Sequence, residues 1–290
     1  IREAATAALQ VAVSSSARLV RESGGGMEMP GRSGNDASGR RKGPSGRSYR
    51  SKAGLTLQPK KMRGRKPSSQ RWLTRQLNDP FVAETQARGL RSRAAIKLEQ
   101  MDDKHHFLMP HMRVVDLGCA PGGWLQVVMK RCRIESGKGV LVGVDLLVVD
   151  PVPGAKLLVG DITETDILQQ VHTAIEGKAD AVLSDMAAAT TGHRQTDHLR
   201  TMGLLEIALD FADQVLAPGG IFLAKAFRGG SDRQFQELLN QRFDKVRYIK
   251  PPASRSESVE TYVLGTGFRG APADKQRDAG AKPQTGYSPI

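Results

Sequence analysis

Apolar residues along the chain fall into short continuous runs that alternate with longer segments of helical periodicity. The runs predict strands, and they lie at residues 113–117, 139–145, 156–159, 179–183, 221–226, 244–249 and 260–265. The periodic segments predict helices, and they lie at about residues 80–101, 122–131, 163–176, 197–215 and 232–241. Strands separated by helices are typical of βαβ units, so the pattern predicts an α/β, Rossmann-like fold with a mostly parallel sheet and helices on both faces.

Charged residues stand at or just past the ends of five predicted strands. They are Asp116, Asp145, Asp161, Asp185 and Lys225. Because ligands of such sheets bind beyond the carboxyl ends of the strands, we expect a functional site at this edge.

A glycine loop, DLGCAPGGW at residues 116–124, connects the first predicted strand to a helix. Glycines let the backbone turn tightly and let a ligand approach closely. The spacing differs from the G-x-G-x-x-G loop of dinucleotide-binding proteins, and Pro121 removes one backbone donor. Asp145 could accept from two ribose hydroxyls and Asp161 could meet an adenine amine, which favours S-adenosylmethionine (SAM). The alternative is a generic strand–loop–helix corner.

Lys225 lies in IFLAKAF, an apolar strand, where a lysine is costly unless it is paired. Together with Lys97, Asp185 and Glu260 it could orient a ribose 2′-hydroxyl toward a methyl sulfonium. Taken singly, Lys97 could be a helix-surface lysine and Glu260 an edge-strand charge. Two roles for Lys225 stay open, proton acceptor or hydrogen-bonding anchor, and in both the larger contribution is alignment of nucleophile and methyl group.

The net charge of +13 is concentrated at the N-terminus, where residues 1–70 hold 15 Lys and Arg against 4 Asp and Glu. We therefore expect a basic, disordered arm at 1–67 that binds RNA, a catalytic domain at 68–270 and a flexible tail at 271–290. A merely solubilising arm is the alternative. Residues 1–21 resemble the remnant of an organelle transit peptide, although a plain disordered terminus would look similar.

Other residues limit the classes of protein and of site to which the chain can belong. Cys119 and Cys132 fit no metal motif and indicate a reducing compartment. His193 and His198 lack a third ligand at useful spacing, so we expect no metal. No apolar run approaches the roughly 18 residues of a membrane span.

The motifs DLGCAPGGW, GVDLLVVDP, GDIT, SDMA and PPASRSESVETYVLGTG, with Lys225, together resemble the RrmJ/FtsJ family of SAM-dependent ribosomal RNA 2′-O-methyltransferases. The resemblance covers about residues 68–269. It implies a seven-stranded sheet whose last strand is antiparallel, and a catalytic tetrad of Lys97, Asp185, Lys225 and Glu260. The implied cofactor contacts are Asp116, Gly118, Pro121, Gly122, Gly123, Trp124, Asp145, Leu146, Asp161, Ile162 and Asp185. Trp124 either packs beneath the cofactor or fills the core.

TTGHRQTDH and the Arg- and Ser-rich N-terminus resemble the mitochondrial branch of that family. This implies a monomer in the mitochondrial matrix that methylates a uridine ribose in the peptidyl-transferase A-loop of large-subunit rRNA, coupled to subunit assembly. The arm would contact ribosomal proteins or assembly factors of the pre-ribosomal particle. We expect Arg88, Arg91, Arg93 and Arg255 to read RNA phosphates, and a solvated helix face is the alternative for the first three.

The chain departs from the family pattern after SDMA, where Ala188-Ala189 replace the usual Pro-Asn. Alanine offers no amide to the substrate, which puts nucleotide positioning in question. A second hypothesis is therefore an assembly factor of methyltransferase fold whose binding, not catalysis, is its main role. A dinucleotide oxidoreductase is disfavoured by the loop spacing and the strand lysine.

Overall fold

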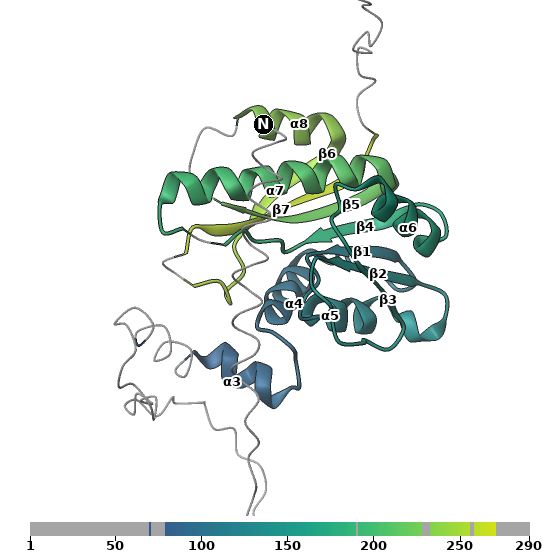
Figure 1. Cartoon of the computed structure of the whole chain (residues 1–290), viewed down its shortest axis with the longest axis horizontal. Helices are drawn as coiled ribbons and strands as arrows, with labels where there is room; N and C mark the ends of the chain where they lie inside the picture. The colour runs from purple at the N-terminus through teal and green to yellow at the C-terminus, as the bar shows by residue number, and fades with distance from the viewer. Residues whose placement is uncertain (1–69, 71–78, 190, 228–232, 256–257, 271–290) are drawn as a thin grey trace, which may run out of the picture.

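The computed structural model describes residues 70, 79–189, 191–227, 233–255 and 258–270 (Figure 1). The expected arm at 1–67 and the expected tail at 271–290 lie outside this part of the chain, so both stay predictions. Within it, no helix combines the length and apolar character that a membrane span requires.

All seven predicted strands form, and they join into one sheet. They are β1 (Arg113–Leu117), β2 (Val140–Asp145), β3 (Ala155–Val159), β4 (Ala179–Ser184), β5 (Leu216–Phe227), β6 (Phe243–Ile249) and β7 (Glu260–Phe268). Their order in the sheet is β3-β2-β1-β4-β5-β7-β6. Pairing is parallel from β3 through β5, whereas β7 is antiparallel to both β5 and β6. The predicted α/β fold, with its last strand antiparallel, is confirmed.

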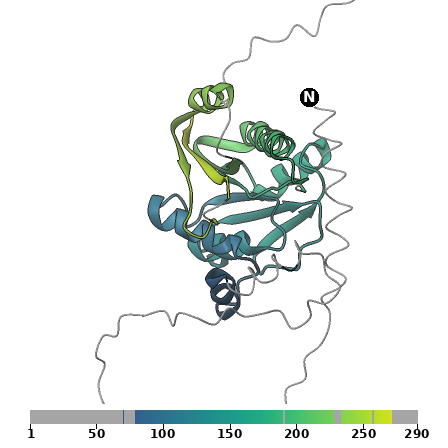
Figure 2. The same ribbon diagram turned by 90° about the vertical axis from the view of Figure 1, so that its left-hand side faces the viewer.

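Helices cover both faces of the sheet. They are α3 (Pro80–Ala87), α4 (Ala94–His105), α5 (Gly123–Arg131), α6 (Thr165–Ile175), α7 (Arg194–Val215) and α8 (Arg233–Arg242), with a short 3-10 turn at Ile134–Ser136. In Figure 1, α7 and α8 lie above the sheet and α4 and α5 below it. Figure 2 shows the same separation from the side, with the green α7 and α8 opposite the blue α3 and α4.

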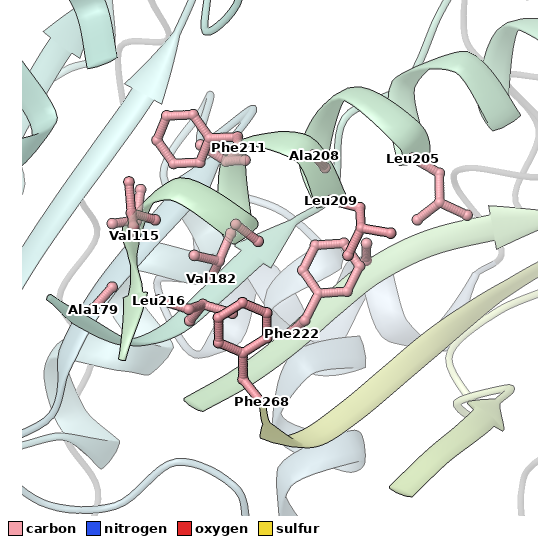
Figure 3. Close-up of a cluster of buried hydrophobic side chains, with 14 of the residues drawn as sticks. Val115, Ala179, Val182, Leu205, Ala208, Leu209, Phe211, Leu216, Phe222 and Phe268 are labelled. Carbon is pink, nitrogen blue, oxygen red and sulfur yellow. The ribbon is translucent and has the colours of Figure 1, made fainter. Parts of the chain in front are cut away.

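Successive residues of each strand pack into two separate hydrophobic cores, one on each face of the sheet. Val115 and Val182 belong to the core under α6, α7 and α8, and Figure 3 shows Val182 close to Leu209 and Phe222. Their neighbour Val114 belongs instead to the core under α4 and α5. Because successive side chains of a strand point to opposite faces, this burial fixes the register of each strand. It also fixes which polar residues at the strand ends share a face.

One predicted helix, 80–101, is wrong as a single element, because it forms α3 and α4 with a link at residues 88–93. Gly89 adopts a φ of +64°, which ends α3. Gln126 of α5 then holds the link, because its Oε1 accepts from the backbone N–H of Arg91 at 2.8 Å and its Nε2 donates to the carbonyl of Gly89 at 3.1 Å. These long-range contacts place Lys97 near the start of α4.

The boundary between α7 and β5 also differs from the prediction, which began this strand at residue 221. β5 begins at Leu216, where the chain pairs with Ala179 of β4, and the next pair is Ala181 with Ile221. Between these pairs β4 advances two residues and β5 advances five. The Pro-Gly-Gly segment that was expected to separate helix and strand is therefore accommodated as an irregularity inside β5.

Candidate active site

Three aspartates at the carboxyl ends of neighbouring strands share one face of the sheet. Asp116 of β1 pairs in register with Gly143 of β2, and Asp145 follows Gly143 by two residues on the same strand. Asp185 comes directly after β4, and its backbone N–H donates to the carbonyl of Leu117. Alternation puts all three side chains on the face covered by α4 and α5. These acids therefore lie together at the carboxyl ends of the strands, where the sequence predicts a functional site.

Lys225 and Tyr262 face each other across β5 and β7. They are register partners in this antiparallel pair, and Glu260 lies two residues before Tyr262 on the same face of β7. Lys97 reaches them from α4, whose buried residues pack on that face. Four elements thus bring the tetrad residues together from positions far apart in the sequence.

Two ion pairs join the tetrad residues. Nζ of Lys225 lies 2.7 Å from Oδ1 of Asp185 and also donates to the backbone carbonyl of Asp185 at 2.9 Å. Nζ of Lys97 donates to Oε1 of Glu260. The side chain of Lys225 is only 10% exposed, so its pairing offsets the cost of burying an ammonium group. The sequence-based expectation that this lysine is largely buried and paired is confirmed.

The hydroxyl of Tyr262 connects the two pairs. It donates to Oδ1 of Asp185 at 2.8 Å, and it lies 3.4 Å from both Nζ of Lys97 and Oε1 of Glu260. Burial first, and then the nearby carboxylates of Asp185 and Glu260, raise the pKa of Tyr262 well above its usual value. The group is therefore a neutral donor at the centre of four charges. Our reading of the sequence missed it, although strand periodicity places it on the same face as Glu260.

Glu260 is held as a carboxylate despite its burial. Burial raises its pKa, but the ammonium groups of Lys97 and Lys225, with hydrogen bonds from Lys97 and Ser254, bring the pKa below its usual value. The hydroxyl of Ser254 lies 3.1 Å from Oε1 of Glu260. The cluster therefore combines two cations with two anions, and it can donate to and accept from a hydroxyl group placed among them.

Asp116 is fully buried, and within the described part of the chain neither carboxylate oxygen has a hydrogen-bond partner. Burial, followed by the charges of Asp185 and Asp145, raises the pKa of Asp116 well above its usual value. A buried carboxyl without a partner is costly, and a cationic group nearby would remove much of that cost. The site is thus suited to a ligand that carries positive charge.

The glycine loop is tied to the end of β2 by Asp145. Its Oδ2 accepts from the N–H of Ala120 at 2.8 Å and its Oδ1 accepts from the N–H of Leu147 at 2.9 Å. Each oxygen keeps a second lone pair, so the carboxylate can also accept from ligand hydroxyls. Gly118 and Gly122 have φ values of +73° and +106°, which explains why glycine is needed at these two turns.

The other expected cofactor residues lie around this loop. Asp161 and Ile162 follow β3, and Oδ1 of Asp161 accepts from the N–H of Thr163 at 2.9 Å. Pro121 and Gly123 flank the N-cap of α5, and Leu146 follows β2. Trp124 lies in the core, 3% exposed, with its indole N–H donating to the carbonyl of Ala94 at 2.8 Å. The structure therefore favours the packing role of Trp124 over a place beneath a cofactor.

The arginines expected to read phosphates already have protein partners. Arg88 pairs with Glu84 and Glu99, and Arg93 pairs with Asp79 and donates to a backbone carbonyl. Arg91 donates to three backbone carbonyls. Arg255 lies in the segment between β6 and β7, where its carbonyl accepts from Ser258. Phosphate binding by these residues stays a prediction, and for the first three it would require these contacts to exchange.

The segment after Asp185 is held by α7. The carbonyl of Ala189 accepts from Nη1 of Arg200 at 3.2 Å, and Oδ1 of Asp197 accepts from the N–H of Thr191 at 2.7 Å. His193 is the N-cap of α7 and its Nδ1 lies 3.2 Å from Oγ1 of Thr196, and within the described ranges no three potential metal ligands gather. Hydrogen bonds from α7 to backbone groups therefore hold this segment, in which the three residues 187–189 are alanines.

Comparison with known proteins identifies the family. The model for the FtsJ-like methyltransferases matches residues 90–268. The chain belongs to the FtsJ-like methyltransferase family. Its matched region runs from the link before α4 to the end of β7, so it contains all four tetrad residues and the glycine loop.

Two relatives with similar sequences are bacterial proteins. The chain is 52% identical over 232 residues to the ribosomal RNA large subunit methyltransferase E of Parvibaculum lavamentivorans, covering 78% of this chain and 91% of the relative. It is 55% identical over 216 residues to the protein of the same name from Granulibacter bethesdensis, covering 74% and 92%. A crystal structure of a ribosomal RNA methyltransferase from Plasmodium falciparum superposes with a TM-score of 0.56 at 30% identity, covering 62% of this chain and 99% of that one.

Proposed function

We propose that the chain transfers the methyl group of SAM to a ribose 2′-hydroxyl of large-subunit ribosomal RNA. The observation that carries this proposal is the pair of lysine–carboxylate contacts joined by Tyr262 at the carboxyl end of the sheet. The names of the similar bacterial proteins support the substrate, because they are ribosomal RNA large subunit methyltransferases.

The residues around the glycine loop suit SAM. Asp145 would accept from the ribose hydroxyls and Asp161 from the adenine amine, because each carboxylate keeps acceptor capacity beyond its backbone contacts. Asp116, buried without a hydrogen-bond partner among the described residues, would sit close to the positive charge of the ligand. When bound, SAM supplies a methyl group activated by a sulfonium.

The tetrad would act on the ribose hydroxyl. Lys225 and Lys97 would hold the hydroxyl oxygen by hydrogen bonds, and Asp185 and Glu260 would hold the two ammonium groups in place. During methylation the hydroxyl oxygen would lose its proton and gain the methyl group, whose bond to the sulfonium sulfur breaks, and either Lys225 in its neutral form or water would take the proton. In both cases alignment of the oxygen with the methyl group supplies the larger part of the rate.

Finer features of the substrate belong to the same proposal. We propose a uridine of the peptidyl-transferase A-loop as the target, with methylation coupled to assembly of the large subunit. The sequence motifs support this choice. A mitochondrial location rests only on the N-terminal composition and on residues 190–198, whereas the relatives reported above are bacterial.

A variant of Lys225 tests the activity. Lys225→Ala should lower methyl transfer to undermethylated large subunits by about 10²- to 10⁴-fold, because the hydroxyl loses its donor or base, while particle binding stays near normal. The measurement is mapping of ribose methylation on large-subunit rRNA. Lys156→Ala is the matched control. Lys156 forms an exposed ion pair with Glu176 and lies on the edge strand β3, which β2, β1 and β4 separate from β5. Wild-type protein that binds SAM and particles without methylating the rRNA would refute the proposed activity.

A second candidate function is assembly of the large subunit without a need for methylation. The observation that favours it is Ala188-Ala189, where the segment beside the tetrad offers no side-chain amide. Cells that carry Lys225→Ala in place of the wild-type chain distinguish the two. Normal levels of mature large subunits in such cells would support the assembly role, and accumulated precursors would exclude it.

A further inference from the structure

Arg91 makes an unusual set of contacts for a residue in a surface link. Its guanidinium donates to the backbone carbonyls of Pro121 at 3.2 Å, Asp150 at 2.6 Å and Pro151 at 2.7 Å. Within the described part of the chain, no carboxylate forms a salt bridge with it. Charge-assisted hydrogen bonds to carbonyls are stronger than neutral ones, so these three contacts are a substantial attachment.

The three carbonyls belong to the two loops that would enclose the methyl donor. Pro121 lies in the glycine loop after β1, whereas Asp150 and Pro151 lie in the loop after β2. Asp145 joins the same two loops by accepting from Ala120 and Leu147. The loops are therefore connected twice, once by the carboxylate of Asp145 and once by the guanidinium of Arg91.

The glycine loop is shaped to receive this arginine. A Cβ added at Gly122 would lie 2.8 Å from Nη1 of Arg91, and one added at Gly123 would lie 2.2 Å from Oγ of Ser92. Gln126 fixes the backbone of the link from the other side by accepting from the N–H of Arg91. Thus the position of the guanidinium is set by close packing as well as by hydrogen bonds.

We propose that Arg91 is a positioning residue for the SAM pocket, one that sets the separation of the glycine loop and the loop after β2. This inference rests on the proposed function, since it takes SAM as the ligand between those loops. The planar guanidinium can donate to several carbonyls at once, which an ammonium group on a flexible stem cannot do in the same geometry. The link that carries Arg91 continues into α4, so the same contacts also support the position of Lys97.

Binding of S-adenosylhomocysteine to the full chain tests the inference directly. In titration calorimetry, Arg91→Lys should weaken binding by about tenfold, equivalent to about 1.4 kcal/mol, because the positive charge stays but the joint contact with both loops is lost. Arg233→Lys is the matched control, because it makes the same exchange in an exposed ion pair with Glu237 on α8, on the other face of the sheet, so it should change the Kd by less than about twofold.

Kinetics separate a positioning role from loss of the fold. Arg91→Lys should raise KM for SAM while kcat falls much less, with a circular dichroism spectrum like that of the wild type. Gly122→Ala offers a second route, because its added Cβ would displace the same guanidinium, and it should weaken S-adenosylhomocysteine binding at least as much.

Two outcomes would overturn the inference. Unchanged S-adenosylhomocysteine affinity in Arg91→Lys would show that the two loops need no such tie. Unchanged affinity with weaker rRNA binding would instead assign Arg91 to phosphates, as the sequence suggested. If the wild-type chain itself does not bind S-adenosylhomocysteine, the proposed function fails first, and the two failures are therefore distinguishable.

Discussion

At the residue scale, the chemistry of the site depends on how individual groups are buried and paired. Glu260 belongs to the tetrad and Asp116 lies within the influence of Asp185, yet the pKa values of these two acids move in opposite directions. Glu260 has two ammonium groups nearby, whereas Asp116 has only other carboxylates and no hydrogen-bond partner among the described residues. The same chemical group, a carboxyl, therefore contributes differently to stability and to ligand binding at the two positions.

Asp116→Asn should stabilise the ligand-free protein at neutral pH. Because the folded-state pKa of Asp116 is raised, the unfolded chain loses this proton first, so stability falls as the pH rises from about 3.9 toward the folded-state pKa. An asparagine does not ionise, so the stability of the variant does not fall with pH for this reason. Thermal unfolding at several pH values should show a difference in Tm between variant and wild type that grows with pH, and a constant difference would contradict it.

Glu260→Gln should lower methyl transfer less than Lys225→Ala does. Glu260 acts through Lys97, and an amide can still accept a hydrogen bond from that ammonium group, so we expect a loss of about tenfold in kcat. The side-chain volume is nearly unchanged, which limits effects on folding. Single-turnover rates on undermethylated subunits measure the loss. A loss equal to that of Lys225→Ala would mean that Glu260 contacts the reacting hydroxyl itself.

At the scale of elements, the link between α3 and α4 decides where Lys97 stands. Helical periodicity continues from residue 80 to 101, so the sequence predicts a single helix there. The break arises because Gly89 adopts a positive φ and Gln126 from another helix satisfies the exposed backbone groups. Such tertiary hydrogen bonds offset the local preference for continuing the helix.

Asp79→Ala should destabilise this part of the fold. Asp79 is the N-cap of α3, where its Oδ1 accepts from the N–H of Phe81. Its Oδ2 pairs with Arg93, the last residue of the link before α4. We expect the free energy of unfolding to fall by about 1–2 kcal/mol. Urea unfolding measures this loss. Glu84→Ala, which removes only an exposed ion pair with Arg88, should cost less than about 0.5 kcal/mol.

At the scale of the whole molecule, the strands of one sheet place their candidate functional groups at one end, and α4 adds Lys97. The parallel strands β1, β2 and β4 deliver aspartates, and the antiparallel β7 delivers Glu260 and Tyr262 back to the same edge. Along the sequence, the excess of positive charge is concentrated at the N-terminus, where residues 1–70 hold 15 Lys and Arg against 4 Asp and Glu. We therefore expect that a deletion can separate particle binding from catalysis.

Removal of residues 1–66 should weaken binding to large-subunit rRNA and reduce its dependence on salt. Basic residues that contact phosphates release counterions, so fewer contacts give a shallower slope of affinity against salt concentration. Filter binding at several salt concentrations measures both effects, and affinity for S-adenosylhomocysteine serves as the control that should not change. Equal affinity and slope with and without the arm would rule out its role in RNA binding.

The sequence by itself determined the seven strands, the mostly parallel sheet and the four residues predicted to form a tetrad, but not the break between α3 and α4. Apolar runs reveal strands because each strand must bury one or both faces, and a lysine inside such a run has to find a partner. The resemblance to a known family added the antiparallel direction of the last strand, which the pairing of β7 with β5 and β6 confirms. The charged residues at strand ends could be recognised as site candidates, because their position follows once the strand has been located.

Only the tertiary structure decided which groups touch. It placed Tyr262 between the two ion pairs, left Asp116 without a hydrogen-bond partner in the described part of the chain, and turned Arg91 toward loop carbonyls. These contacts join residues that are tens of positions apart, so local periodicity carries no information about them. Their energies depend on burial and on partners from other elements, and both exist only once the chain has folded.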